Sequence, residues 1–144
     1  MLQKTRAVIL HQLKYTDSGI IVQVYTRDFG RLSVIIKGMR SRKSGKHNVF
    51  FQPLSVLDIV VYIKGSRSIQ ILKEFSVYYI PADVWSDVKK SSIALFLGEM
   101  MTSVLKEESP QPEMFDFIES SVIYFNGIRS SFSNFHIAFL IGLC

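Results

Sequence analysis

The chain has 144 residues, of which 48% are hydrophobic and 20% charged, and its formal net charge is +5. This composition is typical of a folded globular chain, and the length allows one domain and at most part of a second. Cys144 is the only cysteine in the sequence, which excludes an intrachain disulfide. No apolar run approaches the roughly 20 residues that span a bilayer, and no signal-peptide cleavage site follows the N-terminus. We therefore expect a cytoplasmic protein that does not bind membranes.

Five short segments with strand character occupy the first 80 residues. Alternating apolar residues place Ile20, Val22 and Val24 on one face of the second segment. Turn residues follow the first, second and fourth segments, and a longer connection follows the third. This arrangement suits a small closed β-barrel, because closure removes exposed strand edges. The expected strands are 5–15, 20–28, 32–38, 55–63 and 69–79.

The hydrophobic period changes after Pro81. Apolar residues recur at helical spacing over 83–109 and again over 113–127, and a third helix begins near Ser131 or Ser133. This last helix runs to the end of the sequence without a cap or a polar exit, which predicts a truncated domain. We expect a mainly β domain at residues 1–80, followed by the start of an all-helical domain at residues 81–144.

The charge is divided unequally between these two parts. Residues 1–80 carry 13 Lys and Arg and four acids, whereas residues 81–144 carry four Lys and Arg and eight acids. Such an asymmetry indicates a basic half that faces a polyanion. The strongest local signal is KGMRSRKSGKH at 37–47, with five Lys or Arg and no acid. It is not a nucleotide-binding P-loop, because Gly38 and Gly45 are too far apart and His47 replaces the required hydroxyl.

We expect the cations in and around this segment to contact nucleic-acid phosphates. Guanidinium groups fork onto two phosphate oxygens, and lysines act as point charges. Tyr15 and Phe29 are candidates for stacking on bases, because both lie at predicted turns beside basic residues. The expected contacting residues are Lys14, Arg27, Arg31, Lys37, Arg40, Arg42, Lys43, Lys46, Lys64 and Arg67.

The sequence contains no recognisable catalytic or metal-binding motif. The three histidines share no helical spacing, and a zinc site needs about four Cys or His ligands. We therefore expect no enzymatic activity and no cofactor in this chain. Besides a DNA-binding module, two interpretations stay open: a protein-interaction scaffold whose acidic helices dock partners, and a barrel that binds structured RNA.

Three short motifs accompany the predicted strands: TRDFG at 26–30, KGMR at 37–40 and QPLSVLD at 52–58. With them, about residues 4–75 closely resemble the N-terminal part of the RecO family of bacterial recombination mediators. The resemblance implies an OB-fold, a five-stranded Greek-key barrel, followed by a helical domain. In this resemblance Lys37, Arg40, Arg42 and Lys43 match the region where the family's barrel meets DNA.

The resemblance also implies an activity and partners. Family members bind single- and double-stranded DNA, anneal complementary strands and help to load the RecA recombinase during DNA repair. They pair with RecR and contact the single-strand-binding protein, largely through the helical domain. A bacterial, nucleoid-associated location follows from this role. Members are longer than this chain, and many carry a four-cysteine zinc module beyond the matching region.

Overall fold

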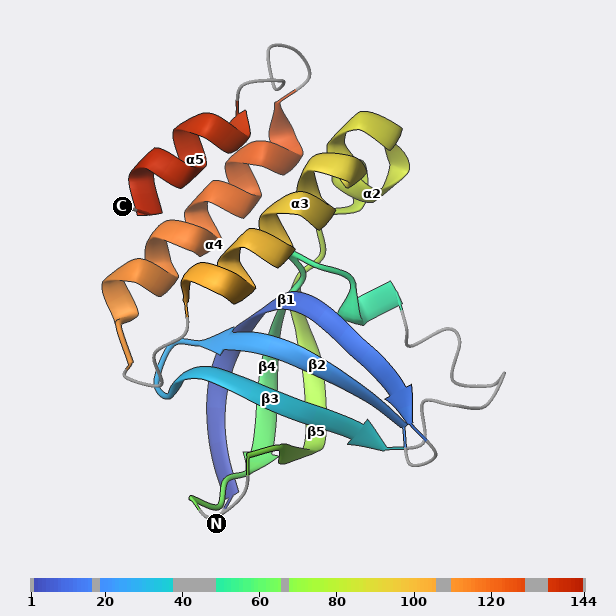
Figure 1. Ribbon diagram of the computed structural model, residues 1–144, viewed down its shortest axis with the longest axis vertical. Helices are drawn as coiled ribbons and strands as arrows, with labels where there is room; N and C mark the ends of the chain where they lie inside the picture. Colours follow the sequence, from blue (N-terminus) through green and yellow to red (C-terminus); the bar gives the residue numbers. More distant parts are fainter. Residues whose placement is uncertain are drawn as a thin grey trace.

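The computed structural model describes residues 2–16, 19–37, 49–65, 68–105, 110–128 and 135–143. A β-barrel lies at one end of the molecule and the helices are layered over the other (Figure 1). The strands are β1 (Leu2–Thr16), β2 (Gly19–Thr26), β3 (Gly30–Lys37), β4 (Val56–Tyr62) and β5 (Gln70–Tyr79). The helical elements are the 3₁₀ turn η2 (Val49–Phe51), α2 (Ala82–Ser86), α3 (Val88–Val104), α4 (Pro112–Gly127) and α5 (Phe135–Leu143).

The barrel is closed in the strand order β1-β2-β3-β5-β4. The long strand β1 pairs with a strand on each side and so closes the barrel. Its residue Ala7, for example, pairs with Thr26 of β2 and with Leu57 of β4. β3 and β5 run parallel where Val34 pairs with Gln70, and the other strand pairs are antiparallel. This is the five-stranded barrel of the OB-fold, so the predicted fold class is confirmed.

Alternation along β1 divides its side chains between two hydrophobic cores. Ala7 and Ile9 point into the barrel, whereas Val8 and Leu10 point outward toward the helices. In both cores these side chains are almost fully buried. The strand is thus apolar on both faces over this stretch, as expected for a strand with a core on each side.

β2 is buried along its whole length. Ile20, Val22 and Val24 belong to the core inside the barrel, which confirms their predicted shared face. On the outer face, Tyr25 stacks on Phe115 of α4 with ring centroids 6.4 Å apart. Burial raises the pKa of the Tyr25 hydroxyl. The helices therefore cover part of the outer surface of this strand.

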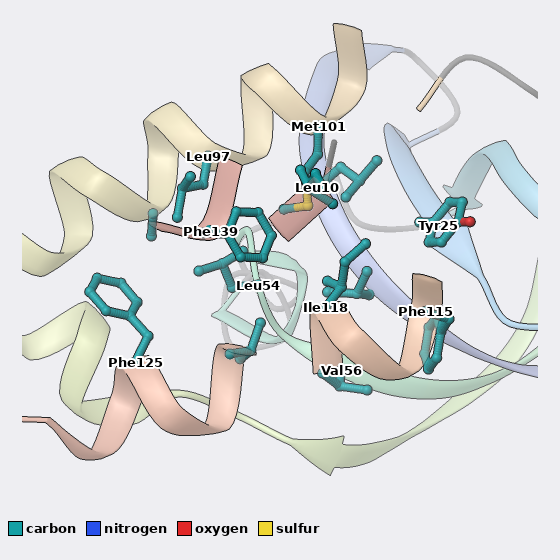
Figure 2. Close-up of a cluster of buried hydrophobic side chains, with 14 of the residues drawn as sticks. Leu10, Tyr25, Leu54, Val56, Leu97, Met101, Phe115, Ile118, Phe125 and Phe139 are labelled. Atoms are coloured by element: carbon teal, nitrogen blue, oxygen red, sulfur yellow. The ribbon is translucent and has the colours of Figure 1, made fainter. Parts of the chain in front are cut away.

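The core between the barrel and the helices joins residues distant in the sequence (Figure 2). Full burial of one such side chain contributes about 1.5–3 kcal/mol, so a cluster of this size fastens the helices firmly to the barrel. Its labelled members are Leu10, Tyr25, Leu54, Val56, Leu97, Met101, Phe115, Ile118, Phe125 and Phe139.

Helix α3 crosses β1 at very short range. A Cβ atom added at Gly98 would lie 2.0 Å from the backbone oxygen of Leu10 and 3.2 Å from Cβ of Pro53. Only a residue without a side chain allows this approach, because the nearest atom belongs to the backbone and cannot rotate away. Gly98 therefore sets the distance between the helical layer and the barrel.

The helical stretch expected over 83–109 is interrupted at Asp87. This residue is extended, with φ −113° and ψ 122°, and its carboxylate accepts hydrogen bonds from the backbone N–H groups of Lys89 and Lys90. Asp is a strong N-cap residue, so α3 begins here although the apolar stripe continues through it. α4 matches its predicted range closely, and the positions at which α5 was expected to begin lie outside the described residues.

Of the three sequence motifs, TRDFG forms a turn and QPLSVLD packs against the helices. In TRDFG, the Thr26 hydroxyl donates to the Gly30 backbone oxygen at 2.7 Å and accepts from the Phe29 N–H, and Gly30 has a positive φ of 69°. A left-handed glycine after a three-residue turn is typical of such hairpins. In QPLSVLD, the Pro53 carbonyl accepts a hydrogen bond from the Trp85 indole, and Leu54 is buried in the core shared with the helices.

Candidate nucleic-acid interface

The basic segment 38–48 starts at one end of the barrel and rejoins the described chain farther along β1. Lys37, the exposed last residue of β3, pairs with Gly19, which also pairs with Thr16 of β1. The segment rejoins the described chain at η2, where Gln12 of β1 donates to the Phe51 carbonyl at 3.1 Å. We call the end of the barrel formed by Thr16, Gly19 and Lys37 the loop end (Figure 1).

Several predicted contact residues belong to or adjoin this end. Lys14 and Tyr15 lie in β1 opposite Ile21 and Ile20, one or two residues before Thr16, and their side chains are outside the described part of the structure. The remaining loop predictions fall on residues that the structure does not describe: Arg40, Arg42, Lys43 and Lys46, together with Arg67 in the connection between β4 and β5.

Lys64 follows β4, two residues after Tyr62, which pairs with Leu2 at the start of β1. Its side chain is exposed, and its backbone N–H donates to the Gln70 side chain at 2.8 Å. Its contact with DNA stays a prediction.

Arg31 faces the helices. Its guanidinium donates to the Gln23 side chain at 2.9 Å and to the backbone carbonyl of Thr102 at 2.7 Å. Thr102 is in the last turn of α3, where carbonyl groups have no partner within the helix and the helix dipole is negative. Arg31 thus caps the C-terminal end of α3, and a contact with DNA stays a prediction.

Arg27 has a carboxylate partner on α4. Its Nε donates to Oδ1 of Asp116 at 3.1 Å and its Nη2 donates to Oδ2 at 3.4 Å. The hydrogen bond and the charge of Asp116 together raise the pKa of Arg27. Phe29, in the same turn, is half-buried, and its predicted stacking on bases is likewise still a prediction.

No sequence pattern indicated that Arg6 would hold the barrel against α4. Its guanidinium pairs with Glu119 of α4 at 3.2 Å, approaches Asp58 of β4 at 3.5 Å and lies 3.5 Å from the centre of the Tyr78 ring. These partners are 52 to 113 residues away in the sequence. No local pattern could have paired them.

Lys90 was also missed, although the sequence contained a signal for it. It lies in the buried stripe of α3, and its ammonium donates to the carbonyls of Asn126 and Ile128 at the C-terminal end of α4. Its helical spacing from Ala94 and Leu97 already placed it on the apolar face. A lysine in such a stripe predicts a buried hydrogen-bonding role.

The two ends of the barrel therefore differ in charge. Between the barrel and α4, four carboxylates surround two arginines; we call this cluster the seam, and its members are Arg6, Arg27, Asp28, Asp58, Asp116 and Glu119. Around the loop end the sequence has Lys14, Lys37 and four further Lys or Arg in 38–47, against one acid, Asp17, between Thr16 and Gly19. From these charges we expect a polyanion to approach the loop end rather than the seam.

Within the described ranges, no group of three or more His, Cys, Asp or Glu is arranged to hold a metal ion. None of the helices in this part of the chain is both long enough and apolar enough to cross a membrane.

Comparison with known proteins gives a consistent family. The family described as "Recombination protein O N terminal" matches residues 1–80. A DNA repair protein RecO from Phocaeicola vulgatus is 39% identical over 98% of this chain and 58% of its own length. A DNA repair protein RecO from Bacteroides fragilis is 35% identical over 99% of this chain and 59% of its own length. A DNA repair protein RecO from Chlorobium luteolum is 31% identical over 98% of this chain and 53% of its own length. The chain thus spans somewhat more than half the length of these relatives, and it belongs to the RecO family.

Proposed function

We propose that the chain is the DNA-binding part of a recombination mediator in DNA repair, and that it binds single- and double-stranded DNA at the loop end. Its relatives are named DNA repair proteins, which supports the general role. The observation that carries DNA binding is where the basic segment leaves and rejoins the described chain: it leaves after Lys37 at the loop end and rejoins beside Gln12 of β1, four residues before Thr16.

Recognition in this proposal is independent of base sequence. Lysine and arginine side chains at the loop end neutralise phosphates, and each contact releases condensed counterions. Two strands held on one neutralised surface repel each other less, so they anneal without any catalytic residue. The outer face of Tyr25, which could have offered a stacking platform on β2, is covered by Phe115.

The partners belong to the proposal for the whole protein. RecR, the single-strand-binding protein and, indirectly, RecA are the partners that family membership suggests, the second of them contacted through the helices. In that role the protein displaces or bypasses the proteins that coat single strands and helps the recombinase to load. The barrel contributes the DNA contact to this process.

Binding to a labelled, mixed-sequence single-stranded DNA should depend steeply on salt. With four or five phosphate contacts, a plot of log affinity against log salt should have a slope near −3, at about −0.7 per contact on a single strand. Fluorescence anisotropy across a salt series measures this slope directly. An RNA of the same sequence, added as competitor, tests the alternative of RNA recognition through 2′-hydroxyl contacts.

Absence of binding at low salt, with the chain folded, would reject the proposal for this chain. Much stronger competition by the RNA than by the DNA would replace it with RNA binding.

A further inference from the structure

The pair formed by Arg27 and Asp116 has the geometry of a phosphate contact. Nε and Nη2 of Arg27 each donate to one carboxylate oxygen, in the way that an arginine engages two phosphate oxygens. The two side chains remain 44% and 53% exposed, so a strand of DNA could reach the guanidinium if the carboxylate were removed. An exposed ion pair of this kind contributes little to stability and opens readily.

The surroundings of this pair oppose DNA binding. Asp28 and Glu119 add negative charge around Arg27, and Glu119 is itself paired with Arg6. A phosphate approaching Arg27 would have to displace Asp116 against the repulsion of these neighbours. The helix thus supplies an internal anion where the sequence alone suggested a DNA contact.

The other two arginines that face the helices are held differently. Arg31 donates into the last turn of α3, and Arg6 lies over the Tyr78 ring between two carboxylates. Releasing either would leave a helix carbonyl or a carboxylate of the seam without its partner. Arg27 is therefore the cation that a single change on α4 can free without disturbing the core.

We propose that Asp116 occupies the place of a DNA phosphate on Arg27 and thereby confines DNA to the loop end. Arg27 is then a latent DNA contact, masked by α4 in the free protein. This inference rests on the proposed DNA binding and deepens it, because it names the residue that limits the extent of the binding surface.

Removing the mask should strengthen DNA binding through one additional phosphate. For Asp116→Asn we expect a salt slope steeper by about 0.7, and therefore about fivefold tighter binding to single-stranded DNA at about 0.1 M salt. Asp116→Ser, which also removes the hydrogen-bonding geometry, should give the same gain. Anisotropy titrations over a salt series measure both quantities, and thermal unfolding verifies that each variant is folded.

Glu113→Gln is the matched control. Glu113 is exposed and lies one turn earlier on α4, and no ion pair involves it among the described residues. The two positions lie within one Debye length, about 10 Å at this salt, so the general change in net charge is the same. We expect Glu113→Gln to change affinity less than twofold and to leave the slope unaltered.

Arg27→Gln completes a double-mutant cycle with Asp116→Asn. Because Arg27 is masked, Arg27→Gln alone should change DNA affinity less than twofold, and in combination with Asp116→Asn it should abolish the fivefold gain. A larger loss of affinity, with a shallower salt slope, in Arg27→Gln alone would overturn the inference, since Arg27 would already contact DNA. A gain that equals the Glu113→Gln control, or that survives the loss of Arg27, would overturn it as well. If the folded wild-type chain binds no DNA, the proposed function is wrong. This outcome differs from the results above, in which the wild type binds DNA and only the masking of Arg27 is rejected.

Discussion

Replacing Gly98 with alanine should destabilise the protein more than any other single-methyl change in the helical layer. The new Cβ would fall 2.0 Å from the Leu10 carbonyl oxygen, so α3 must move away from β1 and lose packing on both sides. Because the clash is with a backbone atom, the cost of overpacking lies at the upper end of the usual range, about 3 kcal/mol or more, against a gain of up to about 1 kcal/mol in helix propensity. We expect a net loss of about 2–3 kcal/mol and a fall in Tm of roughly 5–10 °C in thermal unfolding followed by circular dichroism.

Gly127→Ala is the control for the change in backbone flexibility. Gly127 is also helical, at the end of α4, and a Cβ there would meet no atom within 4 Å. Its free energy of unfolding should equal that of the wild type or exceed it by up to about 1 kcal/mol. Equal stability of Gly98→Ala and Gly127→Ala would show that α3 does not depend on close contact with β1.

The double variant Arg40→Gln and Arg42→Gln should cause the largest loss of DNA binding. If each arginine holds one phosphate, removing both should make the salt slope shallower by about 1.4 and weaken binding about 25-fold at about 0.1 M salt. Anisotropy titration of the labelled single strand measures both changes. The loss should be the same for strands of different base composition, because phosphates are contacted rather than bases.

A second double variant, Lys4→Gln and Lys89→Gln, separates specific contacts from net charge. Both lysines are exposed, and they lie in the first half of β1 and the first turn of α3, outside the loop end. This variant removes the same two charges and should weaken binding only about twofold, with the slope nearly unchanged. Equal losses in the two variants would mean that binding depends on overall charge and not on the basic segment.

Much of the barrel could be predicted, because the strand pattern of apolar residues at every second position is visible in the sequence. Ile20, Val22 and Val24 share a face in the structure as their spacing requires, since strand side chains alternate with a period of two. The break at Asp87 was not predicted, because the apolar stripe passes through it and only the carboxylate cap reveals the new helix start. The double pairing of β1 was equally hidden, because pairing partners depend on the closed barrel and not on local pattern.

The basic composition of the candidate site could be predicted from the sequence, but the contacts of its individual residues could not. The basic segment is evident from charge alone, and the structure adds where both of its ends lie. The partners of Arg27 and Arg31 are 89 and 71 residues distant, so a sequence pattern could not distinguish a cation that faces solvent from one that caps a helix or pairs with α4. Long-range packing decides which arginines remain available to a polyanion.

The most direct test of the account is a titration of ¹⁵N-labelled protein with a short single-stranded DNA, followed by amide chemical shifts. If DNA binds at the loop end, the amides of Gly19 and Lys37 should shift most among the described residues, while those of α4 around Asp116 stay in place. Shifts centred on α4 and the seam, with the loop end unchanged, would contradict it, because DNA would then bind the negatively charged side of the molecule.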